Sequence, residues 1–171
     1  MEVTRPNALE AYSMVLLVCH DRYLLLRRAA SKRFAPNRWT GIGGRVEPDE
    51  FATLRASALR ELAEETGLEP DAVEGFTLRR VLTHARPGEP LTVLLYFTGT
   101  FAEPVLPESA EGTLAWVTAE EIAALDVIEN TAQVIPRLVE DLARDPAGRE
   151  PVVVGAARYS PDGALVRVVW A

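Results

Sequence analysis

Residues 43–68 read GGRVEPDEFATLRASALRELAEETGL, and this stretch determines what we expect of the whole chain. Glu61, Glu64 and Glu65 are spaced three and four residues apart, so on a helix their carboxylates share one sector of the surface. Two carboxylates about 4 Å apart repel by roughly 1 kcal/mol even in water. The cluster therefore favours a proton, an arginine or a divalent cation as its neighbour. Because every donor is oxygen, Mg²⁺ or Mn²⁺ fits better than zinc.

The residues around the carboxylates strengthen this interpretation. Gly43 and Gly44 predict a turn whose backbone can approach a ligand closely, and Gly67 predicts the C-terminal cap of the helix. Arg60 lies one residue before Glu61 and can screen the carboxylates from the side, which leaves their front open to a metal. Without this context, the same glutamates would be typical of a solvated helix face.

The stretch resembles the signature of a known family. Gly44, Glu50 and the run 60–68, RELAEETGL, are similar to the Nudix box of the Nudix hydrolases. The second half matches at each defining position. Nine residues separate Glu50 from Arg60, two more than the family usually has, and two residues rotate a helical position by about 200°. We therefore expect the insertion in a loop or first turn around residues 48–53, where Pro and Asp favour irregular backbone.

The resemblance implies a reaction and a set of site residues. The reaction is Mg²⁺-dependent hydrolysis of a nucleoside diphosphate linked to a group X, with Mn²⁺ as a substitute metal. Nucleoside di- or triphosphates are the expected substrates, giving a nucleoside monophosphate plus phosphate or pyrophosphate. Arg60 would orient Glu61. The implied metal ligands are Glu61, Glu65, Glu64 (sharing a second ion), the Gly43 carbonyl and Glu50.

The general base has two candidate sources, because the family takes it either from the box helix or from a glutamate on a later loop. Glu61 is the first choice. Glu111, five residues before Trp116 in a loop that leads to a late strand, is the best distal candidate, with Glu108 behind it. The alternative for a loop glutamate is simple exposure to solvent.

Substrate contacts are expected from a basic loop, residues 29–38, and its flanks. An arm rich in arginine can meet ligand phosphates beside the metal, whereas a solvated loop is the alternative. Phe34 could stack on a base, and Trp39 is expected in the core. The predicted substrate-binding residues are Arg27, Arg33, Phe34 and Arg38.

The segment WTGIGG, residues 39–44, bears on the substrate. A Gly-x-Gly-Gly sequence resembles the family members that clean up nucleoside triphosphates, including oxidised ones, and so favours free nucleotides. Two other functions are kept as alternatives. The chain also looks like the isopentenyl diphosphate isomerases, which need a cysteine near Gly43 and a histidine-rich metal site that this sequence lacks. A non-catalytic nucleotide-sensing Nudix module is the third possibility, although such modules normally have a decayed box.

Composition limits the class of protein. The chain has 171 residues, 48% hydrophobic and 25% charged, which suits one domain with a substantial core. The net charge of −7 argues against a nucleic-acid polymer as partner. Cys19 is the single cysteine and cannot form an internal disulfide. There is no secretory segment or membrane span in the sequence, so we expect a cytoplasmic protein.

The pattern of strands and helices predicts an α/β fold. Strands are expected at 12–20, 23–28, 72–84, 91–101, 113–117, 152–160 and 164–170. Helices are expected in the box, after a capping box at 118–121, and at 130–144, where Pro136 should bend the helix. We predict a Nudix-like α/β/α sandwich with a mixed sheet, a core at about 12–144 and a C-terminal hairpin at about 151–171. The hairpin is expected at the sheet edge, with a homodimer contact as the alternative.

Overall fold

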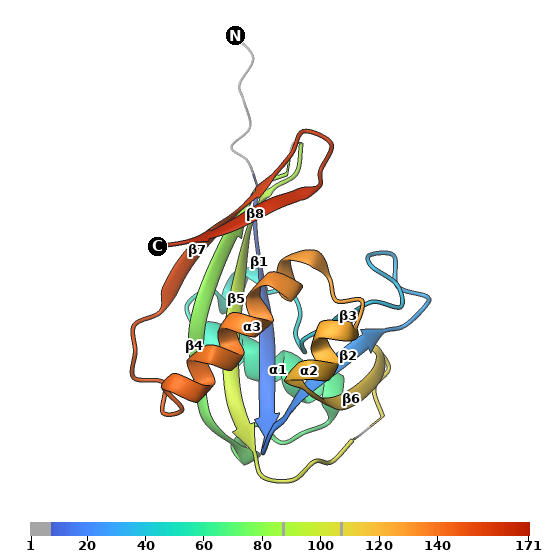
Figure 1. Ribbon diagram of the computed structural model, residues 1–171, viewed down its shortest axis with the longest axis vertical. Coiled ribbons are helices and arrows are strands. Elements are labelled where there is room, and N and C mark those ends of the chain that lie inside the picture. Colours follow the sequence, from blue (N-terminus) through green and yellow to red (C-terminus); the bar gives the residue numbers. More distant parts are fainter. Residues whose placement is uncertain (1–7, 87, 107) are drawn as a thin grey trace.

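The described strands form one mixed sheet in a computed structural model that describes residues 8–86, 88–106 and 108–171 (Figure 1). The order is β3-β2-β1-β5-β4-β7-β8, and β6 pairs with β2. Among the described residues, none of the helices is long and apolar enough to cross a membrane. The strands are β1 (Leu9–Cys19), β2 (Arg22–Arg28), β3 (Trp39–Thr40), β4 (Val73–His84), β5 (Leu91–Phe101), β6 (Gly112–Thr118), β7 (Val153–Tyr159) and β8 (Leu165–Trp170). The helices are α1 (Leu54–Thr66), α2 (Ala119–Ala124) and α3 (Glu129–Arg144), with 3₁₀ turns η1 (Pro48–Glu50) and η2 (Pro70–Ala72).

Helices cover both faces of the sheet, as Figure 1 shows with α1 behind the strands and α3 in front. On one face, Ala58 and Leu62 of α1 pack into a cluster with apolar side chains of β1, β2, β5 and β6. On the other face, Ile135 and Leu138 of α3 join Ile122 of α2 in a second cluster. Burying both faces gives the predicted α/β/α sandwich its two apolar layers.

The central strand β1 leaves room for the glycine turn. It runs parallel to β5 along almost its whole length, but it pairs with β2 only at two positions beside the connecting turn. Beyond that point the segment 42–46 takes the place of β2 next to β1. The Ser13 N–H donates to the Gly44 carbonyl at 2.9 Å, and the Val46 N–H donates to the Ala11 carbonyl at 2.9 Å. Gly43 and Gly44 are thus held against the middle of the sheet.

Most element predictions are confirmed, with local differences. The insertion before the box helix forms η1 and the turn that follows it, so α1 begins at Leu54, after the irregular segment 48–53. Gly67 caps α1 with a φ of 68°, and its N–H donates to the Ala63 carbonyl at 2.7 Å. Thr118 and Glu121 form the predicted capping box of α2. The short β3 was not predicted, and α3 includes Pro136 within its length. The predicted turn at 86–90 includes residue 87, which lies outside the described residues.

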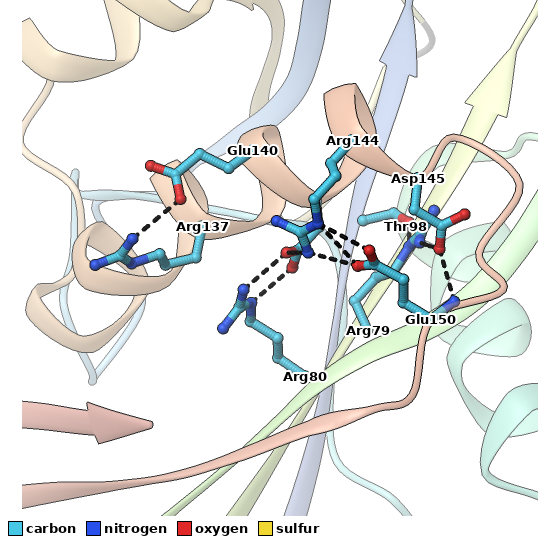
Figure 2. A network of polar contacts seen from close by, with 9 residues as sticks. Arg79, Arg80, Thr98, Arg137, Glu140, Arg144, Asp145 and Glu150 are labelled. Carbon is cyan, nitrogen blue, oxygen red and sulfur yellow. Dashed lines mark hydrogen bonds and ion pairs between the residues drawn. The ribbon is translucent and has the colours of Figure 1, made fainter. Parts of the chain in front are cut away.

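The C-terminal hairpin lies at the sheet edge, where β7 pairs in parallel with β4. Figure 2 shows the polar network that fixes α3 and the segment leading to this hairpin. Arg80 of β4 donates to both carboxylate oxygens of Asp141 in α3, at 2.6 and 2.7 Å, and its guanidinium lies 4.8 Å from the Trp170 ring centroid. Arg79 pairs with Asp145 at 3.0 Å in the same network. These contacts connect β4, α3 and β8.

We expect Asp141→Asn to lower the free energy of unfolding by about 3 kcal/mol at pH 7, because the substitution leaves the buried Arg80 guanidinium without its carboxylate. Burial raises the pKa of Asp141, but the hydrogen bonds from Arg80 outweigh it and the net pKa is lowered. The ion pair therefore contributes fully above the ordinary aspartate value of about 4, and its contribution is lost as the pH falls toward the lowered pKa. Urea unfolding of both proteins at several pH values measures this.

The gap in unfolding free energy between wild type and Asp141→Asn should accordingly narrow below about pH 4. Asp71→Asn is the matched control, because Asp71 is exposed in η2. A gap of constant size from pH 7 to pH 3 would show that the carboxylate charge of Asp141 does not stabilise the fold.

Candidate active site

A cavity of about 620 Å³ lies where α1, the glycine turn and the sheet meet. Glu61, Glu64 and Glu65 line it from α1, and Gly43 and Gly44 line it from the turn beside β1. The cavity continues along the sheet to the end of β4 and the start of α3. The main acidic residues of the box therefore open into a space that is large enough for a small-molecule ligand.

The glycine turn positions Glu65. The Gly43 N–H donates to Glu65 Oε2 at 2.8 Å. The carbonyls of both neighbours are engaged, since Ile42 accepts from Val15 at 2.6 Å and Gly44 accepts from Ser13 at 2.9 Å. Among the described residues no hydrogen bond to the Gly43 carbonyl is found. This carbonyl is available to a ligand.

Glu65 carries a perturbed carboxyl. Burial raises its pKa to about 7, the Gly43 N–H opposes the rise, and the nearby Glu111 and Glu61 add to it. The negative charges of Glu111 and Glu61 thus act on a Glu65 carboxyl that burial has already removed from water. A divalent cation in front of Glu65 would reverse this effect, because it favours the ionised form of every carboxylate around it.

Arg60 is the centre of a second set of contacts. It donates to Glu50 from Nε at 2.7 Å and from a terminal nitrogen at 2.9 Å, and its other terminal nitrogen lies 2.9 Å from Glu61 and 3.0 Å from Glu64. These carboxylates raise the pKa of Arg60 further. Glu61 is 15% exposed, and its pKa is raised by burial in spite of the arginine. Arg60 therefore contacts the Glu61 carboxylate directly, and the orienting role that the family resemblance implies stays a prediction.

Glu50 contacts Arg60 and its own turn and lies outside the cavity lining. Both of its carboxylate oxygens are occupied: one accepts from Arg60, and the other accepts from Arg60, the Ser57 hydroxyl at 2.8 Å and the Glu47 N–H at 2.9 Å. The hydrogen bonds from Arg60, Glu47 and Ser57 lower the pKa of Glu50 to about 2. It does not line the cavity. In this arrangement Glu50 supports Arg60, and its predicted role as a metal ligand stays a prediction.

The donor set fits a hard divalent cation. Glu61 and Glu65 supply carboxylate oxygens and Gly43 supplies a carbonyl, which are the ligand types that Mg²⁺ and Mn²⁺ take. Within the described parts of the chain no three acidic, histidine or cysteine side chains stand close enough to hold an ion together. Glu61 is turned toward Arg60, and Glu65 is turned toward the Gly43 N–H.

Comparison with known proteins identifies the family. The NUDIX domain model matches residues 9–138. This chain belongs to the Nudix family. The matched range contains the whole cavity wall described above, from β1 to α3. It excludes the whole C-terminal hairpin, which begins after residue 150.

Two curated relatives are hydrolases. The chain is 31% identical over 169 residues to the m7GpppN-mRNA hydrolase NUDT17 of Danio rerio, covering 90% of this chain and 53% of the relative. It is 30% identical over 132 residues to the oxidized purine nucleoside triphosphate hydrolase of Mus musculus, covering 75% of this chain and 79% of the relative. The chain thus spans about half the length of the first relative and most of the second. These matches confirm the sequence-based assignment to the Nudix hydrolases.

A solved structure supports the fold. The MutT protein of Methanosarcina mazei Go1 superposes with a TM-score of 0.67 at 22% identity, covering 81% of this chain and 98% of that one. At this identity the likeness concerns the fold alone. The predicted Nudix-like mixed sheet with flanking helices is confirmed.

The distal glutamates of this Nudix chain lie in different places. Glu111 lines the cavity, forms an ion pair with Lys32 and is close enough to Glu65 to raise its pKa. Glu108 is exposed and does not line the cavity. Only Glu111 therefore stays a candidate for a catalytic role from that loop.

The basic loop contributes less to the cavity than we expected. Phe34 lines it and is 56% exposed, and its ring lies 5.8 Å from the guanidinium of Arg28, which also lines the cavity. Arg38 does not: it donates to Asp126, Glu129 and the Val127 carbonyl at 2.7–3.0 Å, which ties β3 to the start of α3. Arg27 and Arg33 are exposed outside the lining. Of the predicted substrate-binding residues, Phe34 lines the cavity, whereas Arg27, Arg33 and Arg38 do not. Arg28, which was not predicted, lines it as well.

Other cavity residues gave no signal in the sequence. They occupy strands and a helix start that read as ordinary structural segments, and only the fold brings them together. Alternation along the strands predicted at 72–84 and 91–101 does not indicate which side of a strand is open to a ligand. The residues that sequence reasoning missed are Glu10, Tyr12, Ser13, Met14, Leu26, Thr40, Arg45, His84, Arg86, Glu89, Thr92, Leu94, Tyr96, Ala110, Ile128, Asn130 and Thr131.

Proposed function

We propose that this Nudix chain hydrolyses nucleoside di- or triphosphates with Mg²⁺, giving a nucleoside monophosphate plus phosphate or pyrophosphate. The observation that carries the proposal is Glu65, a partly buried carboxyl with a pKa of about 7 that faces a 620 Å³ cavity beside Glu61. The similarity to an oxidized purine nucleoside triphosphate hydrolase favours free nucleotides as substrates. The Gly-x-Gly-Gly sequence at 41–44 favours the same class.

In this proposal Glu61, Glu65 and the Gly43 carbonyl hold the main metal ion, and Glu64 shares a second ion. When bound, the cation neutralises phosphate oxygens and lowers the pKa of the attacking water. Mn²⁺ offers the same preference for oxygen donors and should substitute. The Gly43 carbonyl can take part because no hydrogen bond to it is found among the described residues, whereas the carbonyls of Ile42 and Gly44 accept from β1.

The other residues bind, orient or move a proton. Arg60, held by Glu50, keeps the Glu61 carboxylate at the cavity wall. Arg28 supplies a positive charge in the cavity near Glu65, where it can meet a phosphate oxygen. Glu61 accepts the proton of the attacking water, because its carboxylate lines the cavity beside Glu65. Glu111 is the alternative base, because it lines the same cavity.

The proposal is tested with a panel of substrates and Mg²⁺, with products separated by chromatography. The panel contains the common nucleoside di- and triphosphates, an oxidised guanine triphosphate, nucleoside diphosphate sugars and dinucleoside polyphosphates. We expect turnover of free nucleotides, with a nucleoside monophosphate as product and no turnover without a divalent cation. Turnover of sugar or dinucleotide substrates alone would overturn it.

The general base is tested by comparing Glu61→Gln with Glu111→Gln. We expect Glu61→Gln to lower kcat by several hundredfold or more, since it loses a proton acceptor and a metal ligand. Glu111→Gln should lower kcat by about tenfold or less, because its charge acts on Glu65 from a distance. The reverse ranking would move the general base to Glu111. The dependence of kcat on Mg²⁺ concentration in each variant separates loss of metal binding from loss of the base.

A further inference from the structure

Two loops meet at the wall of the cavity that holds the box glutamates. The loop 29–38 follows β2, and the turn 109–111 leads into β6, which pairs with β2 over its whole length (Figure 1). Arg28 and Phe34 line the cavity at the first loop, and Glu111 lines it at the second. The junction between the two loops therefore determines where these side chains stand in the cavity.

Backbone hydrogen bonds form the junction. The Ala29 N–H donates to the Glu111 carbonyl at 2.9 Å, which extends the ladder between β2 and β6 beyond its last pair, Arg28 with Gly112. The Lys32 N–H donates to the Ala29 carbonyl at 3.1 Å, so the chain turns back tightly after β2. This turn brings the Lys32 side chain to Glu111.

A side-chain contact reinforces the same junction. The Lys32 ammonium forms an ion pair with the Glu111 carboxylate, and the Glu111 N–H donates to the Ser109 hydroxyl at 3.2 Å. Among the residues that the structure describes, no other ion pair involves Lys32 or Glu111. Lys32 does not line the cavity. It thus contacts a cavity residue from outside the cavity.

The two loops place opposite charges near Glu65. Burial is the main cause of the raised pKa of Glu65, and of the neighbouring charges Glu111 raises this pKa while Arg28 lowers it. Glu111 and Arg28 are therefore both close enough to Glu65 to act on it electrostatically. A shift of the loop junction would change the field at the carboxylates, because the interaction of two charges depends on their separation.

We propose that Lys32 is a positioning residue of the active site, whose ion pair with Glu111 joins the two loops and so keeps Glu111 and Arg28 in place beside Glu65. The kinetic consequence rests on the proposed function, whereas the junction itself does not. The Lys32 and Glu111 side chains are 30% and 36% exposed. Ion pairs that are partly exposed contribute little, so we expect effects of about three- to tenfold.

Amide hydrogen exchange, followed by NMR, tests the junction without substrate, metal or turnover. We expect Lys32→Met to raise the exchange rate of the Ala29 amide by about three- to tenfold, because the Ala29 N–H donates across the junction to Glu111. The Val15 amide, which donates to Ile42 beside the glycine turn, should exchange at the wild-type rate. Lys32→Arg should preserve the Ala29 rate, since it keeps the charge. Unchanged exchange of Ala29 in Lys32→Met would overturn the proposal.

Arg137→Met is the matched control. Arg137 forms an exposed ion pair with Glu140 on α3, and neither residue lines this cavity. The variant changes the net charge of the chain by the same amount as Lys32→Met, so it controls for any general effect of charge on an anionic substrate. We expect it to leave Ala29 exchange and kcat unchanged. Melting temperatures of all variants show that the fold is kept.

A double-mutant cycle with Glu111→Gln tests whether Lys32 acts through Glu111. Lys32→Met should lower kcat for a nucleoside triphosphate by about three- to tenfold with KM unchanged, and Lys32→Arg should restore kcat. In the Glu111→Gln background, Lys32→Met should cause no further loss, because its partner is already neutral. A raised KM in that background would show that Lys32 binds the substrate directly, and would overturn the positioning role.

The two measurements separate this proposal from the proposed function. Faster Ala29 exchange in Lys32→Met, in a protein that does not hydrolyse nucleotides, would refute only the proposed function. Nucleotide hydrolysis with unchanged Ala29 exchange would refute only the role of Lys32. Faster exchange together with an unchanged kcat would also refute that role, because the junction would then not position the site.

Discussion

Glu65→Gln should lower kcat for a nucleoside triphosphate by about a thousandfold or more. The amide keeps the shape of the side chain but removes the charge that would hold the cation, and such electrostatic stabilisation is worth several kcal/mol at about 1.4 kcal/mol per factor of ten. In the structure the Glu65 carboxylate accepts from the Gly43 N–H. The amide oxygen of glutamine can accept the same hydrogen bond, so the variant should still fold. Steady-state kinetics at saturating Mg²⁺ measure the loss, and metal titration should show weakened Mn²⁺ binding.

Glu69→Gln is the matched control, since Glu69 is an exposed glutamate just beyond the same helix. We expect it to leave kcat and melting temperature unchanged. A Glu65→Gln enzyme within tenfold of the wild-type rate would exclude Glu65 as a main metal ligand. An inactive variant with intact Mn²⁺ binding would instead place the role of Glu65 in proton transfer.

The sequence predicted the parts of the site that depend on local structure. Glu61, Glu64 and Glu65 are neighbours on α1 because of helical spacing alone, and Gly67 caps that helix with the expected left-handed backbone. Their position in the cavity follows from the glycine turn, which the sequence also indicated. These features need only residues within one stretch of the chain, so pattern and propensity suffice to find them.

Glu50 shows where a motif alone is insufficient. The insertion was correctly placed ahead of the helix, but its consequence for the side chain was not predicted. Once η1 carries the extra residues, Glu50 reaches Arg60, Ser57 and its own turn, and both oxygens are used there. The sequence does not give the distance between η1 and α1. It therefore could not show that Glu50 lies close enough to Arg60 for a bidentate contact.

The basic residues show the same limit at longer range. Arg38 is part of a basic stretch in the sequence, but its partners Asp126 and Glu129 lie about ninety residues later. Arg86 was read as part of a turn, and its place above Tyr159 depends on the parallel pairing of β7 with β4. Whether a charged side chain is free for a ligand depends on which residues the fold brings beside it.

Gly43→Ala should damage both the activity and the stability of the protein. Gly43 has a φ of 149°, and an added Cβ would lie 2.8 Å from the Ser13 carbonyl carbon and closer still to its oxygen. The backbone of the turn must therefore move away from β1, which displaces the N–H that contacts Glu65. We expect kcat to fall by at least about a hundredfold, the cost typical of a misplacement of about 1 Å. The melting temperature should fall by about 5 °C or more, corresponding to about 2 kcal/mol of strain.

Gly163→Ala separates the clash from backbone strain alone. Gly163 has a φ of 84° in the turn between β7 and β8, and an added Cβ would meet nothing within 4 Å. This variant should lose about 1 kcal/mol from the left-handed conformation and keep its activity. If Gly43→Ala has the same melting temperature as Gly163→Ala and remains active, the turn beside β1 tolerates a side chain. The close approach of Gly43 to the Ser13 carbonyl would then not be needed to position Glu65. If Gly43→Ala is inactive but melts like Gly163→Ala, a small movement of the turn is enough to disrupt the catalytic geometry without loosening the fold.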